Sequence, residues 1–182
     1  MMKSLHHKVR IVSLWAGLWT ATPAVSAVDS GSNELARIKS VFVYHYAQFV
    51  QWPRSSDDTQ DIRLCLVGGG EVVVHLQKLH QKVMTNQRKL SVIVISPTEL
   101  PESCQMMYLG VGRSDEYLEI LQRLRGKPLL TISDQEDFAR QGGIIEMFVR
   151  DDKVRMKINL ERARSVGLKL SSKFLRLAEI LE

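Results

Sequence analysis

Short apolar runs rich in β-branched residues alternate along this chain with amphipathic segments, and that alternation restricts the fold more than any other feature. The strand pattern is clearest in residues 62–67 (Ile-Arg-Leu-Cys-Leu-Val) and 90–95 (Leu-Ser-Val-Ile-Val-Ile). Because two parallel strands need a long crossover between them, helices alternating with strands favour a parallel sheet. The strands expected on this basis are 62–67, 90–95, 104–111 and 128–132, and the helices are 71–83, 114–124 and 135–140.

The pattern changes after residue 143. Two strand-like runs, 144–149 and 154–158, are separated only by Arg150-Asp-Asp-Lys153, and a short polar loop between strands indicates a hairpin. The last segment is expected to be helical from about Leu160 and again from Ser171 to the end. The sequence therefore predicts a single α/β domain. Its mixed sheet would have about six strands, a parallel first part and a C-terminal antiparallel hairpin, with helices flanking it.

The first helix of the mature chain is expected to begin at Ser32 or Asn33, either of which could be its N-cap. It is expected to end at Trp52-Pro53, because proline disfavours helix at the preceding residue. Four aromatic residues gather near this end: Tyr44, Tyr46, Phe49 and Trp52. Such a cluster can anchor a partner or fill a core, and for Phe49 the core is the better interpretation.

The N-terminus is typical of a secretory signal peptide. The first ten residues carry three cations and no acid, an apolar run follows to about Ala21, and Val25 and Ala27 form a small-residue cleavage pattern. A retained N-terminal anchor is the alternative. Cleavage after Ala27 would leave residues 28–182 as the exported domain and lower the formal net charge from +5 to +2. So small a charge argues against an electrostatic nucleic-acid binder.

The chain contains two cysteines, Cys65 and Cys104. In an exported protein, one disulfide between them is the simplest interpretation, and two buried free thiols are the alternative. A metal site is disfavoured, because there is no C-x-x-C and no histidine at ligand spacing beside either residue.

No catalytic motif is visible. The Gly68-Gly69-Gly70 turn follows a strand and precedes a helix, as phosphate loops do, but it lacks both the third glycine of G-x-G-x-x-G and the G-K-[ST] of a P-loop. Serines occur without G-x-S-x-G, and the histidines without H-E-x-x-H. We therefore expect neither an enzyme nor a cofactor nor a metal, and consider a binding protein instead.

The closing segment 158–178 mixes cations with apolar residues and raises three interpretations: a basic nucleic-acid arm, a membrane-surface helix, or the end of a globular domain. After the break expected at Gly167, Phe174, Leu175, Ala178 and Leu181 could share one face of a last helix. That pattern, with export, favours the globular interpretation.

Five motifs in this order and spacing resemble the YfiR-like, or HmsC-like, family of small exported proteins. They are Phe49-Val-Gln-Trp-Pro53, Ile62-Arg-Leu-Cys-Leu-Val-Gly68, Leu130-Thr-Ile-Ser-Asp134, the Gly-Gly-Ile of 142–144, and the closing segment with Gly167-Leu-Lys-Leu-Ser-Ser. The resemblance covers essentially all of the chain after the expected signal peptide.

The resemblance implies a function that the residues alone do not. Members of the family are soluble periplasmic repressors that bind the periplasmic sensor domain of an inner-membrane diguanylate cyclase and hold the enzyme off. Release through an outer-membrane lipoprotein or a redox change raises cyclic-di-GMP and favours biofilm formation, and members tend to form homodimers. Cys65 and Cys104 fall where a family disulfide lies. Some relatives carry a second cysteine pair, which this chain lacks, so a redox switch that needs that pair is not expected here.

Two binding hypotheses follow. In the first, the candidate partner interface comprises Arg162, Lys169, Lys173, Arg176 and Trp52; the alternative is that these charges only face water. In the second, the protein is a periplasmic small-ligand sensor whose ligand site lies near Gly68, Gly69, Gly70 and Asp134.

Overall fold

The structure is a computed structural model, and it describes residues 28–53, 61–79, 84–85, 88–99, 103–110 and 114–181. The helices are α1 (Val28–Tyr46), α2 (Glu71–Leu79), α3 (Ser114–Arg123), α4 (Leu160–Ser165) and α5 (Ser172–Leu175). The strands are β1 (Val50–Gln51), β2 (Ile62–Gly68), β3 (Met84–Thr85), β4 (Arg88–Ile95), β5 (Met106–Gly110), β6 (Leu130–Ser133), β7 (Ile145–Arg150), β8 (Lys153–Asn159), β9 (Lys169–Leu170) and β10 (Glu179–Leu181). The expected signal peptide lies outside the described residues, so it and the boundary at residue 28 stay predictions.

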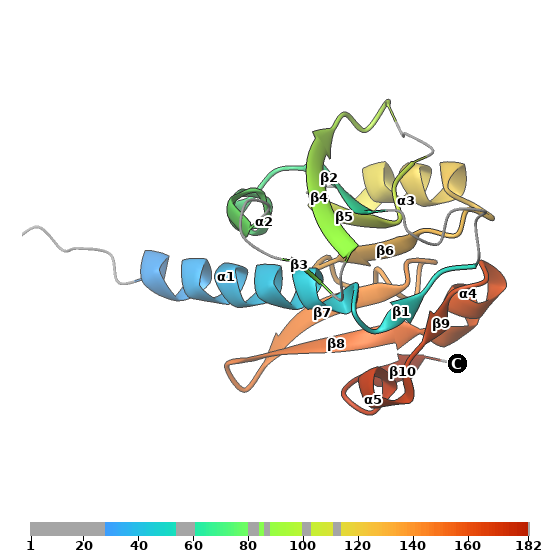
Figure 1. Ribbon diagram of the computed structural model, residues 1–182. Helices are drawn as coiled ribbons and strands as arrows, with labels where there is room; N and C mark the ends of the chain where they lie inside the picture. Colours follow the sequence, from blue (N-terminus) through green and yellow to red (C-terminus); the bar gives the residue numbers. More distant parts are fainter. Residues whose placement is uncertain are drawn as a thin grey trace, which may run out of the picture.

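Eight strands form one mixed sheet in the order β10-β8-β7-β6-β5-β2-β4-β3. Neighbouring strands from β4 through β7 are parallel, whereas β7 and β8 form an antiparallel hairpin. β1 and β9 pair separately as a small antiparallel ladder. The predicted fold class is therefore confirmed: an α/β structure whose sheet begins parallel, ends in an antiparallel hairpin and is flanked by helices (Figure 1).

Both faces of the central strands are covered, and successive side chains of one strand enter different cores. Leu64 and Leu66 of β2 belong to the core beneath α1 and α2, whereas Cys65 and Val67 belong to the core beneath α3. All four side chains are fully buried. This explains why residues 64–67 of β2 form a continuous apolar run instead of an alternating one, since buried parallel strands face apolar layers on both sides.

The predicted disulfide between Cys65 and Cys104 is present, which excludes the alternative of two free thiols. The two Cα atoms are 6.0 Å apart, and the bridge ties the middle of β2 to the residues that lead into β5. A backbone hydrogen bond joins the same two segments, since the amide of Gln105 donates to the carbonyl of Arg63 at 3.0 Å. The bridge lies on the α3 side of the sheet.

Three helical predictions differ from the structure, one in the existence of the helix and two in its bounds. Residues 135–140 form turns, in which Asp137 has a positive φ of 59° that interrupts a right-handed helix. The first helix already starts at Val28 and ends at Tyr46, because the chain then turns and enters β1. The helix expected from Ser171 to the end is one turn, capped by Ser171, after which β10 pairs with the edge of β8. Phe174 and Leu181 therefore do not share a helical face.

Candidate functional site: a pocket at the sheet edge and a basic closing segment

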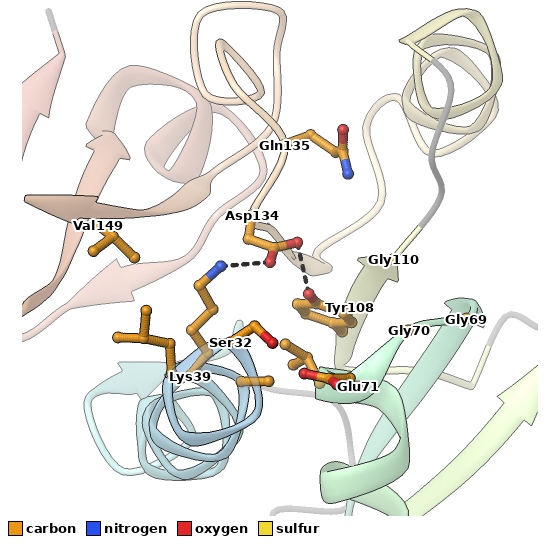
Figure 2. A pocket seen from close by; sticks show the side chains of 13 residues that line it. Ser32, Lys39, Gly69, Gly70, Glu71, Tyr108, Gly110, Asp134, Gln135 and Val149 are labelled. Atoms are coloured by element: carbon orange, nitrogen blue, oxygen red, sulfur yellow. Dashed lines mark hydrogen bonds and ion pairs between the residues drawn. The ribbon is translucent and has the colours of Figure 1, made fainter. Parts of the chain in front are cut away.

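A pocket of about 380 Å³ lies between α1 and the carboxyl ends of β2, β5 and β6 (Figure 2). The strand order reverses at this point: the chain passes from β2 outward to β4 and then returns to β5 on the other side of β2. In open α/β sheets, such a switch point is where ligands commonly bind. The described residues that line the pocket are Ser32, Leu35, Ala36, Lys39, Gly69, Gly70, Glu71, Val72, Tyr108, Gly110, Asp134, Gln135 and Val149.

An ion pair joins helix and sheet inside this pocket. The Nζ of Lys39, from α1, lies 2.6 Å from Oδ2 of Asp134, which follows β6. The hydroxyl of Tyr108, from β5, donates to the other carboxylate oxygen, Oδ1, at 2.8 Å. The Lys39 and Asp134 side chains are 16% and 22% exposed, so the pair is shielded but still reachable from the pocket.

The hydroxyl of Tyr108 stays protonated over the physiological range. Burial raises the pKa of this phenol far above its usual value, and the neighbouring negative charge of Asp134 raises it further. The phenol is therefore a permanent hydrogen-bond donor that holds one oxygen of Asp134 in place, while the cation of Lys39 holds the other.

Glycine is required where the turn after β2 meets the end of β5. Gly70 has a φ of 99°, a left-handed conformation that favours glycine. A Cβ on Gly110 would lie only 2.6 Å from the carbonyl oxygen of Gly69, so the two backbones can approach only because residue 110 has no side chain. The nine-residue helix α2 begins directly after this turn.

The structure brings together only part of the ligand site predicted from the sequence. The structure brings Gly69, Gly70 and Asp134 together in one pocket, whereas Gly68 is not among its lining residues. The sequence did not identify Lys39 or Tyr108 as residues of this site. Lys39 resembles any solvent-facing lysine of a helix, and its partner lies 95 residues away, so no local sequence signal identifies it.

The candidate partner interface lies in a different part of the molecule. Figure 1 shows α4, β9, α5 and β10 gathered at one end, next to β1. Lys169, Lys173 and Arg176 are exposed, and Arg162 is half-buried. Trp52 is also half-buried, and its indole N–H donates to the carbonyl of Gln105 at 3.0 Å. The hydrogen-bond donor of this ring is therefore already used within the protein, and only part of the ring surface is open to a partner.

Aromatic stacking anchors this end of the chain. Phe174 is almost completely buried, with its ring centroid 5.1 Å from that of Tyr46 and 5.3 Å from that of Phe49. The rings of Phe49 and Phe174 are stacked with only 4° between their planes. Phe49 thus packs against the core, in agreement with its interpretation from the sequence.

Within the described ranges, no three His, Cys, Asp or Glu residues cluster in a way that could hold a metal ion. None of the helices described is both long enough and apolar enough to cross a membrane.

The fold is shared with a solved structure, the ABC domain from Streptococcus pneumonia in complex with L-Trp. The TM-score is 0.52 at 7% sequence identity, and the match covers 76% of this chain and 59% of that one. This chain thus corresponds to about three fifths of that protein. At such low identity the likeness shows the fold alone.

The YfiR/HmsC-like family model matches residues 36–179, which include the basic closing segment and the pocket lining apart from Ser32 and Leu35. The resemblance found in the sequence motifs is thereby confirmed over most of the chain. Members of this family act in the periplasm, and they are regulators of diguanylate cyclases and not enzymes. Because the match extends from α1 to the start of β10, this protein belongs to the YfiR/HmsC-like family.

Proposed function

We propose that this protein binds the periplasmic sensor domain of an inner-membrane diguanylate cyclase and holds the enzyme in its inactive state. The cell would then contain less cyclic-di-GMP and form less biofilm. Family membership supports a periplasmic regulator of such a cyclase. The observation that carries the finer proposal is the charge of the closing segment, because it supplies a surface suited to a protein partner.

The stretch from residue 160 to residue 178 contains five arginines or lysines and one acidic residue, Glu161. The five cations are Arg162, Arg164, Lys169, Lys173 and Arg176. Within the described part of the chain, none of them forms an ion pair with a carboxylate. A surface rich in uncompensated positive charge is complementary to an acidic patch, and such complementarity speeds association and selects the partner.

The backbone beneath these charges is fixed. β9 pairs with β1, and the amide of Ser171 donates to the carbonyl of Phe49 at 2.9 Å. Asn159 caps α4, and Ser171 caps α5. A preorganised surface loses less conformational entropy on binding than a mobile arm would, which suits a repressor that must remain bound.

Repression requires differential affinity. A protein that bound the active and inactive forms of the cyclase equally well would shift nothing, however tightly it bound. We therefore infer that the basic segment contacts a part of the sensor domain whose position differs between the two states. A homodimer, and sequestration by an outer-membrane lipoprotein, complete the proposed system.

Charge reversal tests the interface. Lys173→Glu combined with Arg176→Glu should abolish pulldown of the periplasmic domain of a membrane diguanylate cyclase from the same organism. Both side chains are exposed and lack carboxylate partners in the described structure, so the melting temperature should stay unchanged.

The matched control reverses two exposed cations on other elements, Lys78 of α2 and Arg125 after α3, which alters the net charge by the same amount. This control variant should retain the partner. Equal retention by both variants would contradict an interface at the closing segment, and equal loss would mean that only overall charge matters.

A second candidate function, small-ligand sensing, is favoured by one observation: the topology places Gly69, Gly70 and Asp134 around a single pocket at the strand switch point. Thermal-shift screening against amino acids, nucleotides, vitamins and sugars distinguishes the two functions. We expect one chemical class to raise the melting temperature if the pocket binds a ligand. Uniformly unchanged melting temperatures would argue for a repressor that acts through its protein surface alone.

A further inference from the structure

The charged side chains that line the pocket restrict the charge that a ligand can carry. Lys39 and Asp134 neutralise each other, and Glu71 adds a negative charge at the start of α2, so the charged side chains of the lining sum to a net negative value. A phosphate or carboxylate would meet this negative charge. It would also compete with Asp134 for Lys39, and a shielded carboxylate that loses its cation is destabilised.

The hydrogen-bonding groups of the pocket are mixed. An ionised carboxylate has about four lone-pair sites, and Asp134 uses its two oxygens for one contact each with Tyr108 and Lys39. The ammonium of Lys39 has three N–H donors, and Asp134 is the side chain it contacts in the described structure. Gln135 adds an amide that can both donate and accept. Free acceptors and free donors thus lie side by side on an ion pair that need not be broken.

Hydroxyl groups match this arrangement, because each one donates one hydrogen bond and accepts others. The apolar part of the lining, formed by Leu35, Ala36, Val72 and Val149, suits the C–H groups of the same molecule. The volume of about 380 Å³ lies at the small end of the range for ligand pockets, roughly 300–1,000 Å³.

We propose that this pocket binds a small, neutral, hydroxyl-rich molecule of the size of a monosaccharide or a cyclic polyol. This inference rests on the ligand-sensing candidate function and is independent of the proposed partner interface. A zwitterionic amino acid is disfavoured, because its carboxylate would meet the net negative charge of the lining and compete with Asp134 for Lys39, whose Nζ lies 2.6 Å from Oδ2 of Asp134. A neutral ligand leaves that pair intact.

The test uses the full chain, exported and purified from the periplasm. Isothermal titration and thermal shift are measured with a panel of hexoses, pentoses and myo-inositol, and with glycine, L-serine and inorganic phosphate as the charged comparison set. We expect at least one neutral polyhydroxyl probe to bind and raise the melting temperature, while the charged probes leave it unchanged.

Two variants locate the binding. Asp134→Asn keeps the shape of the side chain but removes its charge, and the loss of a charged acceptor should weaken binding of the polyhydroxyl probe by about tenfold or more. Gln135→Ala changes a half-buried residue outside the ion pair, so it should fold normally and also weaken binding. If the Asp134→Asn variant does not fold, Gln135→Ala still tests whether the probe binds in this pocket.

The failures are distinguishable. Binding of an amino acid or phosphate without any sugar or polyol would overturn the ligand class but leave ligand sensing intact. No binding by any probe would overturn the polyhydroxyl proposal, while the wider screen that includes nucleotides and vitamins decides ligand sensing itself. Polyhydroxyl binding that neither variant weakens would place the ligand elsewhere and reject this pocket.

Discussion

Loss of the Cys65–Cys104 disulfide should lower the free energy of unfolding by about 4 kcal/mol, one of the largest effects expected from any change to this chain. The bridge closes a loop with a sequence separation of 39 residues, and opening it returns that conformational freedom to the unfolded state. Both cysteines are buried, so a reduced pair would also leave two thiols in a core built around α3.

Urea denaturation with and without dithiothreitol measures this difference. The Cys65→Ala/Cys104→Ala variant is the control: it should be destabilised by a similar amount and should not respond to the reductant. A loss below about 1 kcal/mol would contradict the entropic argument. Because the chain has only these two cysteines, any thiol–disulfide switch within this protein must act through this one bridge.

The sheet could be predicted because its strands are marked by local composition. The run from Leu90 to Ile95 is β-branched and apolar, and the hairpin at 150–153 is marked by polar residues between two strands. β10 could not be predicted in the same way. Its residues fit a helical pattern, but the open edge of β8 offered backbone hydrogen bonds that overrode this weak preference.

Part of the pocket lining could be predicted from the sequence, namely the residues that directly follow predicted strands. Gly69, Gly70 and Asp134 each follow a strand, and the carboxyl ends of parallel strands meet at one edge of the sheet. Lys39 reaches the same place from a helix, and its position depends on how α1 packs against the sheet. Helix packing of this kind is set by contacts between distant residues, which one sequence does not reveal.

The same helix connects the two candidate sites. Lys39 of α1 lines the pocket, and Tyr46 at its C-terminal end packs against Phe174 of α5. β1 follows immediately and pairs with β9. A ligand that shifted α1 would therefore act directly on the elements that carry the basic surface, so the sensing and repressing functions are physically compatible in one protein.

Replacing Phe174 by alanine should destabilise the protein by about 3–5 kcal/mol, the range for a buried phenylalanine. The ring is 1% exposed and lies against both Tyr46 and Phe49, so truncation removes two aromatic contacts and opens a cavity. The measurements are urea denaturation and hydrogen exchange of the amides in 169–181. Exchange there should accelerate most, because these residues lose their main anchor.

Leu177→Ala is the matched control, since Leu177 is a neighbouring apolar residue that is 66% exposed and should cost no more than about 0.5 kcal/mol. Phe174→Ala should also weaken binding of the cyclase domain although it removes no charge, because the basic segment must then be ordered on binding. Charge reversal at Lys173 and Arg176 should weaken the same binding with no change in stability. If Phe174→Ala leaves partner affinity unaltered while it accelerates exchange in 169–181, the partner must bind a surface other than this segment.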